Sequence, residues 1–342
     1  MVERATRAKT AAAEARLPES VELPTWERRH VLDLDDFSRR EIEQVMETAD
    51  AMKEVLGREI RRVPTLRGTI VATLFYETST RTRSSFELAA KALGADVVSV
   101  AAAASSVQKG ESLIDSARTL QAIGANILVM RHRQSGAPYL VAGHVDMSVI
   151  NAGDGWHAHP TQGLLDAYTI QHHLGDLRGK KVVIIGDILH GRVARSNIWG
   201  LTTMGAQVVL CGPSTLLPWG LRPGYRGNED RMLPPVEVDT NLDRAIEGAD
   251  VVMVLRLQLE RQQAGLLPSM REYIRLYQVN EERLARAKPN APVMHPGPIN
   301  EGLEISPEVA HGACSVIEEQ VTNGVAVRMA LLYLLAKKGG SS

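Results

Sequence analysis

The sequence has few aromatic residues and almost no cysteine. Phe, Trp and Tyr make up 4% of its 342 residues, and its two cysteines are Cys211 and Cys314. They stand far apart, which excludes a dense disulfide framework, and no Cys/His spacing suggests a zinc site. We therefore expect reduced thiols in a cytoplasmic protein, with no metal.

Long apolar runs and a large net charge are also missing. No run approaches the ~18 residues of a membrane span, and the formal net charge of −1 gives no general attraction to nucleic acid or to an anionic membrane. Residues 1–28 lack the apolar core of a secretory signal, so we interpret them as a flexible N-terminal extension. A transit peptide is the weaker alternative, because Glu3, Glu14 and Glu19 are unusual in one.

Short β-branched runs alternate with helical patterns along the chain. They are apolar almost throughout, which is typical of parallel strands buried on both faces. Strands separated by helices predict an α/β fold with open, doubly wound sheets, and the length suggests about two domains of roughly 150 residues each. The expected strands are residues 70–75, 97–100, 127–130, 147–151, 182–186, 207–211, 251–255 and 292–294.

Two stretches of the chain resemble each other. Residues 71–98 match residues 182–209 at a constant offset. In this alignment Arg81 corresponds to Arg192, and each follows the first strand of its stretch. Part of this match is common to all strand–helix–strand units. It still predicts two domains of similar topology, with a cationic loop at the carboxyl end of each sheet, where such sheets bind ligands. We expect a helix from Pro160 to about Leu174 to join the halves.

The most informative segment is the polar run at 79–83, Ser-Thr-Arg-Thr-Arg, between an expected strand and an expected helix. Free backbone N–H groups and the positive end of the helix dipole meet at such a turn. With the hydroxyl groups and a forked arginine they form a site for a phosphate dianion. For so short a motif, an N-capped helix with two solvated arginines is the ordinary alternative.

Other polar segments stand at further strand ends. Residues 159–162, His-Pro-Thr-Gln, place a histidine at the N-cap of the joining helix and a glutamine one turn in. Arg131 ends the third expected strand, and residues 105–112 form a polar, glycine-containing loop of the kind that is often functional. Each segment taken alone also fits an ordinary solvated loop or helix start.

The second half adds two features. Residues 251–255 lead into Arg256 and Gln258, which alternation sets on one face; Arg256 with Arg192 would supply two cations, enough for a small dicarboxylate. Residues 294–300, Met-His-Pro-Gly-Pro-Ile-Asn, form a stiff turn that could close a pocket with backbone carbonyls, or an ordinary Pro/Gly loop.

In this order, these motifs closely resemble the aspartate and ornithine carbamoyltransferase family over about residues 30–336. The 79–83 and 159–162 motifs resemble its carbamoyl phosphate signature. The Lys109-Gly110-Glu111 loop, the 256–261 segment and the 295–298 turn resemble its aspartate branch, and the elements typical of the ornithine branch are missing. The resemblance implies a carbamoyl phosphate-binding domain at 29–163, completed by a C-terminal helix at 316–337, and an aspartate-binding domain at 164–315.

The resemblance also implies the reaction and its residues. The carbamoyl group would pass from carbamoyl phosphate to the α-amine of L-aspartate in pyrimidine synthesis, without a cofactor. Catalysis would fall to Arg81, Thr82, Arg131 and His159. Carbamoyl phosphate would be bound by these four residues with Ser79, Thr80, Gln162, Gly297 and Pro298, and aspartate by Lys109, Arg192, Arg256 and Gln258.

Ser105 and Lys109 match family residues that reach a neighbouring subunit's site, so the resemblance implies a homotrimer, with a regulatory chain or dihydroorotase as possible further partners. Glu77 is interpreted as a domain-closure partner rather than a substrate ligand.

Three rival functions fit the sequence less well. A nicotinamide-dependent dehydrogenase would need a G-x-G-x-x-G turn, but residues 186–191 read Gly-Asp-Ile-Leu-His-Gly. Ornithine would need an anion for its side chain, whereas Arg256 offers a cation. A catalytically silent scaffold is disfavoured because every family site position that we identify carries the expected type of residue.

Overall fold

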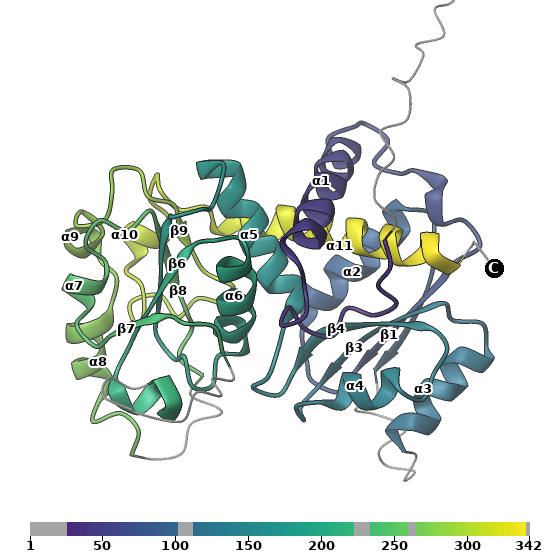
Figure 1. Cartoon of the computed structure of the whole chain (residues 1–342), viewed down its shortest axis with the longest axis horizontal. Coiled ribbons are helices and arrows are strands. Elements are labelled where there is room, and N and C mark those ends of the chain that lie inside the picture. Colours follow the sequence, from purple (N-terminus) through teal and green to yellow (C-terminus); the bar gives the residue numbers. More distant parts are fainter. Residues whose placement is uncertain (1–25, 102–111, 222–232, 259–264, 340–342) are drawn as a thin grey trace, which may run out of the picture.

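The computed structural model describes residues 26–101, 112–221, 233–258 and 265–339, and they form two lobes, each built around a parallel sheet (Figure 1). The first sheet has the order β2-β1-β3-β4 and the second β7-β6-β5-β8-β9. The first contains β1 (Ile70–Phe75), β2 (Asp96–Ala101), β3 (Ile127–His132) and β4 (Ser148–Asp154); the second contains β5 (Lys181–Ile185), β6 (Gln207–Cys211), β7 (Glu237–Asp239), β8 (Val251–Val254) and β9 (Val293–Met294).

Helices surround both sheets. The longer ones are α1 (Arg39–Leu56), α2 (Thr80–Ala92), α3 (Leu113–Ala122), α5 (Pro160–Leu174), α6 (Arg192–Thr203), α8 (Met270–Tyr277) and α11 (Ile317–Gly339). Shorter helices are α4 (Ala137–Ala142), α7 (Leu242–Ala245), α9 (Glu281–Leu284) and α10 (Pro307–Ala310). The expected α/β class with two doubly wound parallel sheets is confirmed.

The two stretches that resemble each other in sequence also form the same elements. The unit β1–α2–β2 corresponds to β5–α6–β6, and both helices end at a glycine with left-handed backbone geometry, Gly94 with φ +79° and Gly205 with φ +85°. Only glycine adopts such φ values at little cost, which explains why this residue recurs at the offset. All eight expected runs form strands. The strand that the pattern missed, β7, is a three-residue edge strand of sequence Glu-Val-Asp.

Two helices join the lobes. The predicted joining helix is present as α5, with Pro160 in its first turn, and it packs against α6 of the second lobe and against α11. The C-terminal helix α11 also packs against α1 and α2, so it lies with the first lobe (Figure 1). A domain boundary at residue 163 would fall inside α5 and stays a prediction.

Cys211 is buried and unpaired, and burial raises the pKa of its thiol to about 12. Cys314 is unpaired and half-buried. In the described part of the chain, every helix is too short or too polar to cross a bilayer. Residues 1–25 of the expected N-terminal extension lie outside the described ranges.

Candidate active site

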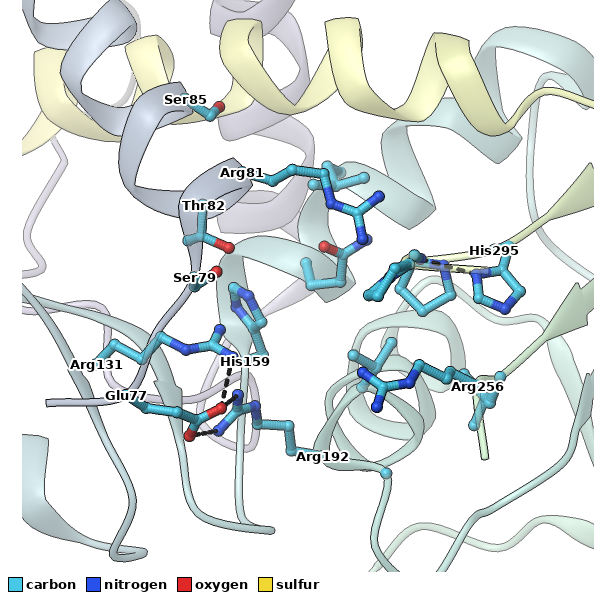
Figure 2. A pocket seen from close by; sticks show the side chains of 18 of the residues that line it. Glu77, Ser79, Arg81, Thr82, Ser85, Arg131, His159, Arg192, Arg256 and His295 are labelled. Atoms are coloured by element: carbon cyan, nitrogen blue, oxygen red, sulfur yellow. Dashed lines mark hydrogen bonds and ion pairs between the residues drawn. The ribbon is translucent and has the colours of Figure 1, made fainter. Parts of the chain in front are cut away.

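A cavity of about 920 Å³ lies between the two lobes, at the carboxyl ends of the strands (Figure 2). In the first sheet β1 lies between β2 and β3, and in the second β5 lies between β6 and β8. The connections after β1 and β3, and those after β5 and β8, therefore diverge at a topological switch point, where doubly wound sheets bind ligands. The cavity is lined from all four of these connections.

Residues 79–82 of the polar run line the cavity at the start of α2. Ser79 is the N-cap residue, yet its side chain makes no capping hydrogen bond, so the alternative of a simple side-chain cap does not hold. Thr82 is buried. The Arg81 guanidinium lies against Gly297, whose backbone has φ +63°, and a Cβ at that position would overlap it. The positive φ favours glycine at this position, and a larger residue would also displace the arginine.

Glu77 holds two arginines together, one from each lobe. Its carboxylate accepts hydrogen bonds from Arg131 Nη2 at 2.7 Å and from Arg192 Nη2 at 2.9 Å. Arg192 also donates to the Gly155 carbonyl at 3.0 Å, and Arg131 to the Ala152 carbonyl at 3.2 Å. Figure 2 shows the three side chains converging at one end of the cavity. The contact fits the interpretation of Glu77 as a link between domains.

His159 lies at the N-terminus of α5 and is 5% exposed, so the alternative of a solvated histidine is wrong. Its backbone N–H donates to Ser196 Oγ at 2.8 Å, which ties it to α6. Burial, followed by the charges of Arg131, Arg192 and Arg328, holds the pKa of the imidazole well below its usual value. The ring is therefore neutral near pH 7. A neutral ring can donate one hydrogen bond to a carbonyl oxygen without carrying a charge.

Gln162, one turn along α5, has a fixed orientation. Its amide Nε2 donates to Asp166 Oδ1 at 2.9 Å, and Gln320 Nε2 donates to the same oxygen at 2.8 Å. Asn197 donates to Asp166 Oδ2 at 2.8 Å. Because the Gln162 NH₂ group is used in this way, its carbonyl oxygen is the atom left to accept a hydrogen bond in the cavity. Burial raises the pKa of Asp166 to about 6, against the opposing effect of the three donors.

Arg256 follows β8 and lines the cavity opposite α2. Burial and then the Arg256 charge lower the pKa of Arg81, so the two guanidinium groups repel each other across the cavity. Gln258 donates its backbone N–H to Asp187 Oδ2 at 3.3 Å, and the Asp187 carboxylate also contacts His190 Nδ1 at 2.8 Å. The arrangement provides positive charge from both lobes, suited to a ligand with negative charge at both ends.

The structure brings most of the predicted residues together. The cavity is lined by Ser79, Thr80, Arg81, Thr82, Arg131, His159, Gln162, Arg192, Arg256, Gln258, Gly297 and Pro298. Ser105 and Lys109, and the 259–261 part of the second-lobe segment, lie outside the described residues.

Other lining residues were missed by the sequence reading, among them Ser85, Arg133, Trp156, Gln320 and Arg328. Arg328 is 5% exposed and donates to Ser85 Oγ at 2.6 Å, from a position 243 residues away. No local pattern marks such a contact. Trp156 stands three residues before the 159–162 motif, so this neighbouring motif was a signal available for it.

Comparisons with known proteins agree with this geometry. Residues 29–172 match the family model "Aspartate/ornithine carbamoyltransferase, carbamoyl-P binding domain", and residues 178–335 match its "Asp/Orn binding domain". The aspartate carbamoyltransferase catalytic subunit of Roseiflexus sp. (strain RS-1) is 62% identical over 309 residues, 90% of this chain and 95% of that relative.

Solved structures of carbamoyltransferases have a similar fold. Aspartate transcarbamoylase from Trypanosoma cruzi in complex with carbamoyl phosphate and aspartate has a TM-score of 0.79 at 31% identity, covering 92% of this chain and 98% of that one. Ornithine carbamoyltransferase from Pyrococcus furiosus has a TM-score of 0.79 at 28% identity, covering 93% and 99%. With both family domains and the site between them present, the chain belongs to the aspartate/ornithine carbamoyltransferase family.

Proposed function

We propose that this chain transfers the carbamoyl group of carbamoyl phosphate to the α-amine of L-aspartate, giving N-carbamoyl-L-aspartate and phosphate in pyrimidine biosynthesis. Relatives at 62% and 58% identity are named as catalytic subunits of aspartate carbamoyltransferase. The observation that carries the proposal is that Arg81 and Arg256, one from each lobe, face the same cavity. One end of the cavity would hold a phosphate and the other a carboxylate.

The phosphate would bind at the N-terminus of α2. Ser79, Thr80 and Thr82 offer hydroxyl groups there, and the first backbone N–H groups of the helix point to the same place. Among the described residues, no carboxylate lies within ion-pair distance of Arg81. Its guanidinium is therefore available to a dianion, which would also relieve the repulsion from Arg256.

The carbamoyl group would lie between α2 and α5. His159 donates to its carbonyl oxygen together with Thr82 and Arg131, and these donors stabilise the negative charge that forms when the amine attacks. The Gln162 oxygen and the Pro298 carbonyl accept from the carbamoyl NH₂. The amine nitrogen bonds to the carbonyl carbon, the bond to the phosphate oxygen breaks, and the departing phosphate takes the amine proton. The protein supplies position and charge, and no covalent nucleophile is needed.

The amino acid would be bound from the second lobe. Arg192 and Arg256 pair with the two carboxylates of aspartate, assisted by Gln258 and by Lys109. Within the described lining the one acidic side chain is Glu77, which is already paired with Arg131 and Arg192. The ammonium group of ornithine would meet arginines instead of an anion. This charge pattern favours aspartate over ornithine.

A homotrimer would complete each site, because Ser105 and Lys109 would reach the site of a neighbouring subunit. A trimer can assemble further with a regulatory chain or dihydroorotase. The protein acts in the cytoplasm, on small molecules rather than on nucleic acid or membrane.

The reaction is tested with the purified full-length protein, carbamoyl phosphate and L-aspartate. We expect carbamoyl aspartate, read by a colorimetric ureido assay, to form in equal amount to the phosphate released. Phosphate released without carbamoyl aspartate would overturn the proposed function.

A further inference from the structure

We propose that Glu304 and His295 are positioning residues that set the preference of the site for a carbamoyl group over an acyl group of the same size. The inference rests on the proposed function, in which the carbonyl of Pro298 accepts a hydrogen bond from the carbamoyl NH₂. The two residues fix the turn at 295–300, in which Pro298 lines the cavity.

His295 directly follows β9, lines the cavity and is 2% exposed. Its Nδ1 accepts the backbone N–H of Gly297 at 2.8 Å, and its Nε2 lies 3.3 Å from Glu304 Oε1. Because Nδ1 accepts, the proton of a neutral ring resides on Nε2, where it is donated to the carboxylate. The imidazole thereby links Gly297, next to Pro298, to Glu304 (Figure 2 shows the ring at the edge of the cavity).

Glu304 is 0% exposed, and it fastens the other end of the same turn. Its Oε1 accepts the backbone N–H of Asn300 at 2.7 Å in addition to the His295 contact. Its Oε2 is buried and has no hydrogen-bond partner among the described residues. A buried carboxylate with an unsatisfied oxygen costs stability. Its place in the chain is better explained by the turn that it holds than by a gain in folding free energy.

The same network reaches the second proposed acceptor. The backbone N–H of His295 donates to Gln320 Oε1 at 2.9 Å, and Gln320 Nε2 donates to Asp166. Asp166 in turn accepts from Gln162 Nε2, which leaves the Gln162 oxygen for the cavity. One continuous chain of hydrogen bonds therefore orients both groups that would accept from the carbamoyl NH₂.

The chemistry makes this network a source of selectivity. A carbamoyl group offers two N–H donors, whereas the methyl group of acetyl phosphate has the same size and offers none. A shift of the turn by a fraction of an ångström weakens the hydrogen bonds to the NH₂ and leaves the hydroxyl groups of Ser79, Thr80 and Thr82 in place. A change at Arg81, which lies against Gly297 of the turn, acts on both phosphates alike. Loss of the contact between His295 and Glu304 should therefore weaken the binding of carbamoyl phosphate more than that of acetyl phosphate.

The test uses the full chain and two ligands: the KM of carbamoyl phosphate, and the inhibition constant of acetyl phosphate against it. In Glu304→Leu we expect the KM of carbamoyl phosphate to rise about tenfold, as for one lost hydrogen bond, and the inhibition constant of acetyl phosphate to rise much less. Glu304→Gln keeps an oxygen for both donors and should stay near wild type. His295→Asn keeps the bond to Gly297, loses that to Glu304, and should be intermediate; it also serves if the leucine variant fails to fold.

Asp250→Asn is the matched control, since Asp250 is a buried carboxylate of the second lobe that pairs with Lys288 at 2.8 Å, away from the cavity. It should leave the ratio of the two constants unchanged. Equal weakening of both ligands in the folded Glu304 and His295 variants, or no change in either, would overturn the positioning role. A wild-type protein that makes no carbamoyl aspartate would instead overturn the proposed function.

Discussion

Arg192 and Glu77 join the two lobes across the cavity, with Nη2 of the arginine 2.9 Å from Oε1 of the glutamate although 115 residues separate them. Arg192 is 5% exposed, so this buried charge needs a partner whenever substrate is absent. A substrate carboxylate would take over part of that pairing. Under the proposed function, the contact would couple the position of the lobes to occupation of the site.

Glu77→Gln tests this coupling. It removes the charge that holds Arg131 and Arg192 together, so we expect kcat to fall about tenfold or more, from poorer alignment of the lobes. Glu77 pairs with Arg131 and not with Arg81, the principal cation of the phosphate site, so the Kd of carbamoyl phosphate should rise by a smaller factor than kcat falls. Initial rates and equilibrium binding measure the two effects. An unchanged kcat would show that the contact has no part in turnover.

Arg81→Ala should remove the principal cation of the phosphate site. We expect a loss of about 3 kcal/mol of transition-state stabilisation, roughly a hundredfold or more in kcat/KM. Arg83→Ala is the control: Arg83 lies on the same helix but pairs with Glu87 at 3.8 Å and does not line the cavity. Similar rates for the two folded variants would show that residues 79–83 only begin the helix and do not bind phosphate.

Arg256→Ala should spare carbamoyl phosphate binding, raise the KM for aspartate and lower kcat, because one substrate carboxylate is left unpaired. Succinate, a dicarboxylate without the amine, should compete with aspartate in the wild type and much less in the variant. Competition kinetics with both proteins measure this difference. Equal inhibition by succinate would place the carboxylate site elsewhere.

Asp166 makes stability depend on pH. Its pKa is raised to about 6 in the folded protein from an ordinary 3.8, so between these values the folded state binds more protons than the unfolded chain. The contribution of protonated Asp166 to the free energy of unfolding is therefore fully present below pH 4. It is lost as the pH rises through 6, a change of about 3 kcal/mol.

Asp166→Asn removes this titration. Urea unfolding at pH 4 and pH 6 should show that the wild type loses more stability than the variant over that interval. Asp33, whose pKa burial also raises to about 6, is present in both proteins and cancels in the comparison. Equal losses of unfolding free energy in the two proteins would mean that Asp166 is ionised at both pH values in the folded state.

The shared site can be tested with mixed trimers. If Lys109 acts in a neighbour's site and Arg192 in its own, Lys109→Ala and Arg192→Ala are each nearly inactive. Refolding equal amounts together gives two independent even chances at each site of a cyclic trimer, so about a quarter of the sites should be native. The recovered activity measures that fraction. Mixed trimers without recovery would place Lys109 in its own chain's site or outside catalysis.

Sequence reasoning was most successful where the pattern is local. Continuous β-branched runs predicted the strands, and Pro160 predicted the start of α5, because burial and backbone geometry act within a few residues. The candidate site followed from topology, since parallel strands of one sheet end at the same edge. The edge strand β7 was missed because three residues with two acids carry no apolar run.

The long-range contacts could not be predicted in this way. Arg328 meets Ser85, and Gln320 meets Asp166, only after α11 returns to the first lobe. Glu304 lies in a loop whose sequence resembles any polar turn, and its burial beside His295 becomes visible only in three dimensions. Such partners are set by packing between distant segments, which no local periodicity records.

In the proposed function the second lobe selects aspartate over ornithine. The most direct measurement supplies the purified protein with carbamoyl phosphate and an equimolar mixture of L-aspartate and L-ornithine, and separates the ureido products. We expect N-carbamoyl-L-aspartate, with citrulline at no more than a trace, because Arg192 and Arg256 repel the ornithine side chain. Citrulline as the main product would show that the second lobe selects ornithine.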